Sequence, residues 1–344
     1  MEELSITNTR YIVKMNYRFF MKILIPVLLL LLTIMPASAQ TSGNSTTYSL
    51  VHISDTQYLA SHYPETYDYT FSYLDSIKER YNISAIIITG DLVETWNDKK
   101  EWDAYSHAVH ETSIPVYVIS GNHDTDGGKD FQYYTLYTGN SKNIYVTSIE
   151  NFDLVGINFA TKPQELASLK KTLVNSPKNL AVIATHDYMD ENGTLSSFGN
   201  YISQQLIVKN TIVLSGHVKG AFVRDRVIGH YVVIEDLTNY QGGIPGGSES
   251  RNVSAGTFYT ITTRDGLVEK ISSKIIWISP LQSFDSDHVL YDISMPEPDA
   301  ESSIPEVTPD CGGIPGLCGI PTIPGLWEYW NSFLEFFKGL FPFF

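Results

Sequence analysis

Five short apolar runs divide the first two thirds of the chain, and each is directly followed by polar residues. All five are rich in β-branched or other apolar side chains and short enough to be buried strands. They are Ser49–Ile53, Ala85–Thr89, Val116–Ser120, Leu180–Thr185 and Thr211–Ser215.

The stretches between these runs predict helices. Tyr69, Tyr73, Ile77 and Tyr81 recur every fourth residue and would form one helical face. The predicted helices are Glu65–Tyr81, Asn97–Glu111, Pro163–Asn175 and Ser197–Lys209. Alternating strands and helices favour a layered α/β fold over an all-β sandwich. Later segments predict hairpin strands, at Phe222–Asp236, Thr257–Thr263 and Leu267–Ile278, with a Gly/Ser-rich loop at Gly242–Gly256.

Side chains capable of metal ligation follow all five runs. Strand ends in a layered α/β fold are where the chain leaves the sheet and builds a site, so we expect these groups to converge. A Gly-Asp or Gly-Asn pair taken alone is typical of a turn, but the order of the whole set indicates a metal site. The candidates are Asp55, Gln57, Gly90-Asp91, Gly121-Asn122-His123-Asp124, His186 and Gly216-His217.

These motifs resemble the ligand framework of the calcineurin-like metallophosphoesterase superfamily, over roughly Tyr48 to Gln241. The resemblance implies a four-layer α/β/β/α fold with two central mixed β-sheets. It also implies one or two divalent ions, of manganese, iron or zinc, bridged by Asp91. The second ion would be bound by Asp91, Asn122, His186 and His217, and the first by Asp55, Gln57 and Asp91.

The same resemblance implies an enzyme, a metal-dependent phosphoric ester hydrolase. A metal-bound hydroxide would attack a phosphomonoester or phosphodiester, His123 would protonate the leaving group, and Asp124 would orient the His123 ring.

Two positions depart from the family pattern. Gln57 stands where histidine is common, and Lys219 stands where the last histidine ligand is expected. A protonated ammonium has no lone pair for a cation. Lys219 could replace the charge of the first ion, or bind the substrate phosphate; alternatively, His62 or His230 could supply the missing ligand. The competing interpretation is a non-catalytic or single-metal binding or surface module that keeps the fold.

The remaining histidines and tyrosines singled out in the sequence are not predicted to be metal ligands. His52 lies inside the first predicted strand, which favours a structural role, and His107 and His110 belong on a surface helix. Three tyrosines could line a cleft or pack in the core, namely Tyr58, Tyr188 and Tyr240.

The sequence predicts four segments along the chain. Basic residues precede the apolar run Ile23–Ile34, and Ala37-Ser38-Ala39 follows it, which is typical of a secretory signal peptide, with an uncleaved anchor as the alternative. The predicted segments are a signal peptide (1–39), a catalytic domain (40–291), a Pro/Gly-rich linker with Cys311 and Cys318 (292–325), and an aromatic amphipathic tail (326–344). The cysteines could form a small-loop disulfide in an exported protein.

The chain is acidic. Its formal net charge is −15, and loss of residues 1–39 removes four basic and two acidic side chains, which gives −17. An acidic surface disfavours a nucleic-acid partner, and a small phosphorylated substrate is expected instead. We expect a secreted or cell-surface protein whose tail either lies at a membrane surface or docks on protein.

Overall fold

The structure is a computed structural model that describes residues 43–239, 254–278 and 284–294. These residues build two sheets of six strands each. The first sheet contains β1 (Ser45–Ile53), β2 (Ile83–Ile88), β3 (Val116–Val118), β10 (Ser254–Arg264), β11 (Leu267–Ile278) and β12 (Phe284–Ser294). The second contains β4 (Ile144–Ile149), β5 (Phe152–Ile157), β6 (Leu180–Thr185), β7 (Asn210–Ser215), β8 (Gly220–Ile228) and β9 (Tyr231–Asn239).

Both sheets are mixed. The first has the strand order β12-β11-β10-β1-β2-β3, with β1, β2 and β3 parallel and the later strands antiparallel. The second has the order β4-β5-β6-β7-β9-β8, with a parallel centre and antiparallel edges. The parallel strands of each sheet therefore end at one edge, where the predicted ligands lie.

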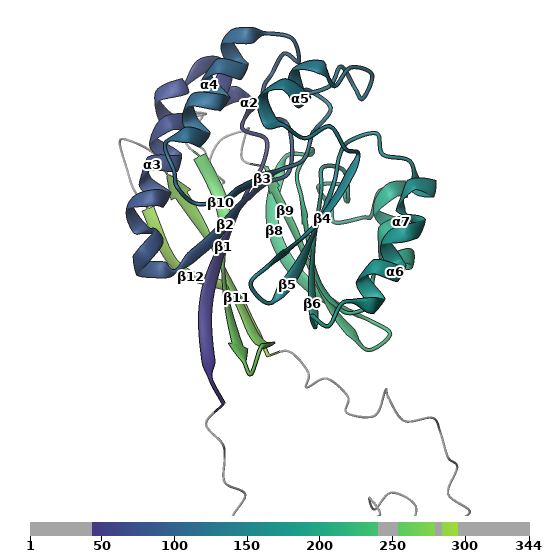
Figure 1. The fold of residues 1–344 in the computed structure, drawn as a ribbon. Helices are drawn as coiled ribbons and strands as arrows, with labels where there is room; N and C mark the ends of the chain where they lie inside the picture. Colours follow the sequence, from purple (N-terminus) through teal and green to yellow (C-terminus); the bar gives the residue numbers. More distant parts are fainter. Residues whose placement is uncertain (1–42, 240–253, 279–283, 295–344) are drawn as a thin grey trace, which may run out of the picture. The chain divides into compact units, whose positions relative to one another are not determined.

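Helices cover the outer face of each sheet, as Figure 1 shows. The helices are α2 (Gln57–His62), α3 (Pro64–Tyr81), α4 (Lys99–His110), α5 (Gln132–Thr138), the 3₁₀ turn η1 (Pro163–Leu166), α6 (Ala167–Asn175) and α7 (Ser197–Gln205). One apolar cluster joins α3 and α4 to the first sheet, a second fills the space between the sheets, and a third joins α6 and α7 to the second sheet. This order of layers confirms the predicted α/β/β/α fold class. None of the described helices has the length and apolar character needed to cross a membrane.

Several elements differ from the sequence expectation. The hairpin of β4 and β5, the short helices α2 and α5, and the strand β12 were not predicted. The predicted run Phe222–Asp236 is two strands, because Gly229 turns the chain with a φ of 65°. Strand β12 ends at Ser294 and so enters the predicted linker. The predicted signal peptide, both cysteines, the tail and Tyr240 lie outside the described residues.

The interface between the first sheet and its helices depends on Trp102. This side chain is fully buried on α4, and its Nε1 donates to the Trp96 carbonyl oxygen at 2.8 Å. We expect Trp102→Ala to lower the free energy of unfolding by about 3–5 kcal/mol, because it opens a large cavity. In urea denaturation, the control Leu136→Ala should change it by less than about 0.5 kcal/mol, because Leu136 is 72% exposed. Equal effects of the two variants would contradict this assignment of the core.

Candidate metal centre

The residues that could bind a cation come from the ends of five strands in both sheets. Asp55 follows β1, Asp91 follows β2, and Asn122 follows β3 in the first sheet. His186 follows β6 and His217 follows β7 in the second sheet. The two sheets thus each supply part of one cluster.

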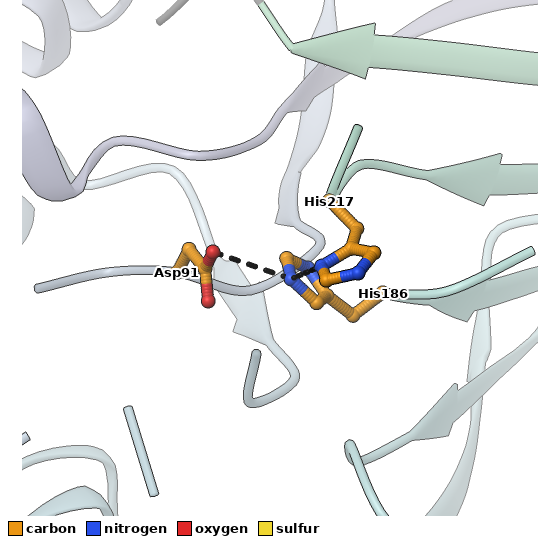
Figure 2. A group of neighbouring side chains, drawn as sticks. All are labelled: Asp91, His186 and His217. Atoms are coloured by element: carbon orange, nitrogen blue, oxygen red, sulfur yellow. Dashed lines mark hydrogen bonds and ion pairs between the residues drawn. The ribbon is translucent and has the colours of Figure 1, made fainter. Parts of the chain in front are cut away.

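Three of the predicted ligands meet around the ring of a fourth, His186. Its Nε2 lies 3.1 Å from Asn122 Oδ1, 3.2 Å from His217 Nδ1 and 3.3 Å from Asp91 Oδ2. Asn122 Oδ1 also lies 2.9 Å from His217 Nδ1. Figure 2 shows Asp91, His186 and His217 turned toward one another, and their ligand atoms all lie within 4.8 Å of each other. The structure therefore brings together the set predicted for the second ion.

The Thr89 main chain sets the tautomer of His186. His186 Nδ1 donates to the Thr89 carbonyl oxygen at 2.7 Å, so Nε2 is the nitrogen that faces the cluster. A histidine ligand held in this way keeps its lone pair directed at the cation site.

Asp55 and Gln57 lie beside the cluster, and Gln57 Nε2 donates to Asp91 Oδ2 at 3.4 Å. Asp55 Oδ2 accepts from Ser54 Oγ at 2.7 Å and from the His217 main-chain N–H at 3.0 Å. Asp55 Oδ1 and Gln57 Oε1 are buried and have no hydrogen-bond partner among the described residues. Buried oxygens without donors are costly, and a divalent cation satisfies such groups. The side chains present therefore fit a cation.

Charges within the cluster shift its pKa values strongly. Burial raises the pKa of Asp55 to about 7, and the charge of Asp91 adds to this effect. Burial also acts to raise the pKa of Asp91, but the charge and hydrogen bond of His186 outweigh it and hold the pKa below its ordinary value. For His186, burial opposes the charged form, yet Asp91 and Asp55 raise its pKa to about 10. Binding of a cation would therefore release a proton from this cluster.

Backbone geometry explains the glycines in the motifs. A Cβ on Gly121 would lie 2.1 Å from Asp91 Oδ1, and one on Gly216 would lie 2.0 Å from Ser54 Oγ. Asp55, Asp91 and His217 have positive φ angles of 58°, 53° and 75°, which non-glycine residues rarely adopt. Strained residues of this kind gather at functional sites, where the surrounding structure holds them.

His123 lies beside the cluster, and its ring orientation corrects one prediction. Its Nδ1 donates to the Glu94 carbonyl oxygen at 2.8 Å, and its main-chain N–H donates to Asp91 Oδ1 at 3.0 Å. Asp124 instead accepts from the main-chain N–H groups of Gly121, Leu92 and Val93. The prediction that Asp124 orients His123 is wrong, because this buried carboxylate is used to hold two loops together.

The pKa values of these two residues are both raised. Burial acts to lower the pKa of His123, but the Glu94 carbonyl group and the charge of Asp91 outweigh it and raise the pKa. For Asp124, burial and the charge of Asp91 raise the pKa to about 7.

The residues considered for the incomplete first ion site do not join the ligand atoms around His186. Lys219 is exposed and forms no hydrogen bond or ion pair with the described residues. His230 lies in the turn between β8 and β9, at the end of the strands opposite His217, so it cannot replace the missing ligand. His62 is exposed and stacks on Tyr58 at 4.3 Å between ring centroids. Neither histidine belongs to the group of ligand atoms around His186.

Sequence reasoning missed one residue at the centre. The Phe159 ring lies 5.9 Å from the His186 ring and 6.2 Å from the His217 ring, between centroids. Phe159 follows β5, a strand that the sequence did not predict, and its apolar ring carries no metal-ligand signal. His52 is fully buried, as its predicted structural role requires, and Tyr188 is fully buried in the core. His107 is exposed on α4, as predicted for a surface helix.

Comparisons with known proteins give one sequence relative and several structures. The uncharacterized protein YvnB of Bacillus subtilis (strain 168) is 27% identical over 233 residues, a match that covers 58% of this chain and 18% of YvnB. The chain thus spans less than a fifth of that relative's length. The protein TT1561 of Thermus thermophilus aligns with a TM-score of 0.41 and 12% identity, over 61% of this chain and 94% of that chain. The calcineurin-like phosphoesterase YfkN from Bacillus subtilis aligns with a TM-score of 0.41 and 11% identity, over 69% and 91%.

A model of the calcineurin-like phosphoesterase family matches residues 48–221. This segment is just over half of the 344 residues and contains every strand-end ligand from Asp55 to His217. The chain belongs to the calcineurin-like phosphoesterase family.

Proposed function

We propose that this protein is a metal-dependent phosphoesterase that hydrolyses a phosphomonoester or a phosphodiester. The observation that carries the proposal is the convergence of Asn122 Oδ1, His217 Nδ1 and Asp91 Oδ2 on His186 Nε2, within 3.3 Å. A carboxylate, an amide and two imidazoles together are ligands for manganese, iron or zinc.

The cluster would hold cations in two chemically different halves. Around Asn122, His186 and His217 the ligands include two imidazoles, which suit a borderline metal. Around Asp55 the unpartnered buried ligand atom is a carboxylate oxygen, and an amide rotation of Gln57 would add a second oxygen; such atoms suit a hard cation such as manganese or magnesium. When bound, a divalent cation acts as a Lewis acid that lowers the pKa of water and offsets the charge of phosphoryl oxygens.

His123 has the geometry to supply a proton to the leaving group. Because Nδ1 donates to the Glu94 carbonyl oxygen, Nε2 is the nitrogen left for the substrate. Its raised pKa favours the protonated ring, which donates from Nε2 to the departing oxygen.

A second candidate function is a binding module with one cation or none. The observation in its favour is Lys219, an exposed ammonium at the position where the family pattern has a ligand. Lys219 would then act on an anionic ligand through its charge alone.

The substrate and location are inferred from the sequence. The net charge of −15 disfavours nucleic acid and is compatible with a small phosphorylated substrate. Export through residues 1–39, and contact of residues 326–344 with a membrane surface, belong to the same proposal.

Loss of the shared carboxylate tests cation binding. We expect Asp91→Asn to weaken Mn²⁺ binding on the order of a hundredfold, because a charged ligand is replaced by a neutral one. Turnover of p-nitrophenyl phosphate and of bis(p-nitrophenyl) phosphate should fall to background. Calorimetric titration with MnCl₂ and assays with added Mn²⁺ measure both effects.

The matched control is Asp126→Asn, which makes the same change on an exposed loop residue that also has a positive φ. This variant should bind Mn²⁺ like the wild type. Metal binding and turnover that survive Asp91→Asn would exclude the proposed centre.

The proposed role of Lys219 can be tested by variants that remove or keep its positive charge. We expect Lys219→Met to raise KM for a phosphomonoester on the order of tenfold with little change in kcat, because a uniform contact to the phosphate is lost. Lys219→Arg should retain most of the wild-type KM, since it keeps the charge. A large gain of activity in Lys219→His would show instead that the lysine replaces a needed ligand.

The loss of activity on removing His123 should depend on the leaving group of the substrate. We expect His123→Asn to lower kcat on the order of a hundredfold for an alkyl phosphate ester, because alkoxides need a proton to leave. An aryl ester such as p-nitrophenyl phosphate should be far less affected. The control is His107→Asn on exposed α4. Equal losses for both esters would rule out proton donation by His123.

A further inference from the structure

A second buried polar cluster lies between the two sheets and contacts the residues that hold the ligands. Its centre is the pair of His52 on β1 and Asp236 on β9, both fully buried, with His52 Nδ1 2.8 Å from Asp236 Oδ2. The proposed chemistry uses neither residue. Hydrogen bonds must replace the lost hydration of a buried carboxylate, and the carboxylate of Asp236 has such bonds.

Most donors to Asp236 come from the opposite sheet. Its Oδ2 accepts from His52 Nδ1 and from the Tyr259 hydroxyl at 2.7 Å. Its Oδ1 accepts from Thr238 Oγ1 at 2.6 Å and from Thr257 Oγ1 at 3.3 Å. His52, Tyr259 and Thr257 belong to the first sheet, whereas Asp236 and Thr238 belong to the second. The carboxylate of Asp236 therefore joins the two sheets by directional bonds.

Directional bonds matter here because the cluster that fills the space between the sheets is apolar, and the hydrogen bonds of Asn179 with Val268 join the sheets at the other end of the strands. The cluster between the sheets consists of aliphatic and aromatic side chains, whose attraction does not depend on orientation. The ligands, however, are divided between the sheets. Their spacing thus depends on how one sheet is placed against the other, which hydrogen bonds can specify.

Two contacts lead from this pair to the ligands. His52 Nε2 lies 2.8 Å from Thr89 Oγ1, and the Thr89 carbonyl oxygen accepts from His186 Nδ1. Thr89 also directly precedes Gly90-Asp91. On the other side, Ser215 Oγ donates to the Asp236 carbonyl oxygen at 2.8 Å, and Ser215 directly precedes Gly216-His217.

We propose that His52 and Asp236 are positioning residues. Their inter-sheet hydrogen bond, together with the contacts of Thr89 and Ser215, fixes the distance between the ligands of the first sheet and those of the second. This inference rests on the proposed cation binding. Outer partners of metal ligands typically affect affinity by about 10–100-fold.

The test compares near-isosteric variants of the full chain by Mn²⁺ calorimetry, Mn²⁺ electron paramagnetic resonance and urea denaturation. Thr89→Val removes the hydroxyl that pairs with His52, and Thr89→Ser restores it. His52→Leu removes the centre of the network. The control is Thr263→Val, because Thr263 is equally buried and pairs with Thr46 Oγ1 at 2.7 Å; it lies on β10 beside the start of β1, at the end of that strand away from Asp55.

We expect Thr89→Val and His52→Leu each to weaken Mn²⁺ binding at least about tenfold and to change the Mn²⁺ spectrum. Thr89→Ser should keep the wild-type affinity and spectrum. The double variant Thr89→Val/His52→Leu should bind Mn²⁺ no more weakly than the worse of the two single variants. Thr263→Val should lose stability in urea but keep wild-type affinity.

The outcomes separate the two proposals. A wild-type protein that binds no Mn²⁺ would refute the proposed function, and with it this inference. A wild type that binds Mn²⁺ while Thr89→Val behaves like Thr263→Val would refute the positioning role alone. Should His52→Leu not fold, the Thr89→Val and Thr89→Ser pair still decides the question.

Discussion

The burial of three neighbouring carboxylates is the constraint on which this structure depends. Asp55, Asp91 and Asp124 are each at most 5% exposed; burial raises the pKa of Asp55 and of Asp124, and the charge of Asp91 adds to this effect. Burying such a set of carboxylates lowers the free energy of unfolding unless cations or hydrogen-bond donors surround them. Main-chain N–H groups satisfy Asp124, and His186 partly satisfies Asp91. Asp55 Oδ1 has no donor among the described residues, and a cation is the group that its chemistry fits.

The fold meets this constraint by separating two kinds of interaction. Along much of their length the sheets are held by apolar contacts, and the hydrogen bonds of Asn179 with Val268 join them at the end away from the ligands. At the ligand-bearing edge, polar groups take over: main-chain donors fix Asp124, the Thr89 carbonyl fixes His186, and Asp236 bonds across the sheets. Close glycine contacts and positive φ angles at Asp55, Asp91 and His217 are the strain that this arrangement imposes.

The local chemistry of the site could be predicted from the sequence, whereas its long-range partners could not. Asp91, Asn122, His186 and His217 each follow a strong apolar run, so the strand-end rule identified them. Strand β4 is half-exposed and at an edge, so it lacks the apolar pattern that revealed the central strands. The partners of Asp124 and the His123 ring are main-chain groups, which no sequence pattern displays. His52 was expected to be structural, but its partner Asp236 is 184 residues away.

If the proposed centre takes two cations, the unequal ligands of its two parts set the order in which they bind. The half with His186 and His217 offers imidazoles and should bind a borderline cation more tightly than the oxygen-only half near Asp55 and Gln57. Once the first cation is bound, Asp91 is partly neutralised and attracts a second cation less. Lys219, two residues after His217, adds a positive charge nearby. The proposed enzyme should therefore acquire its cations in sequence, with the second one weakly held and exchangeable.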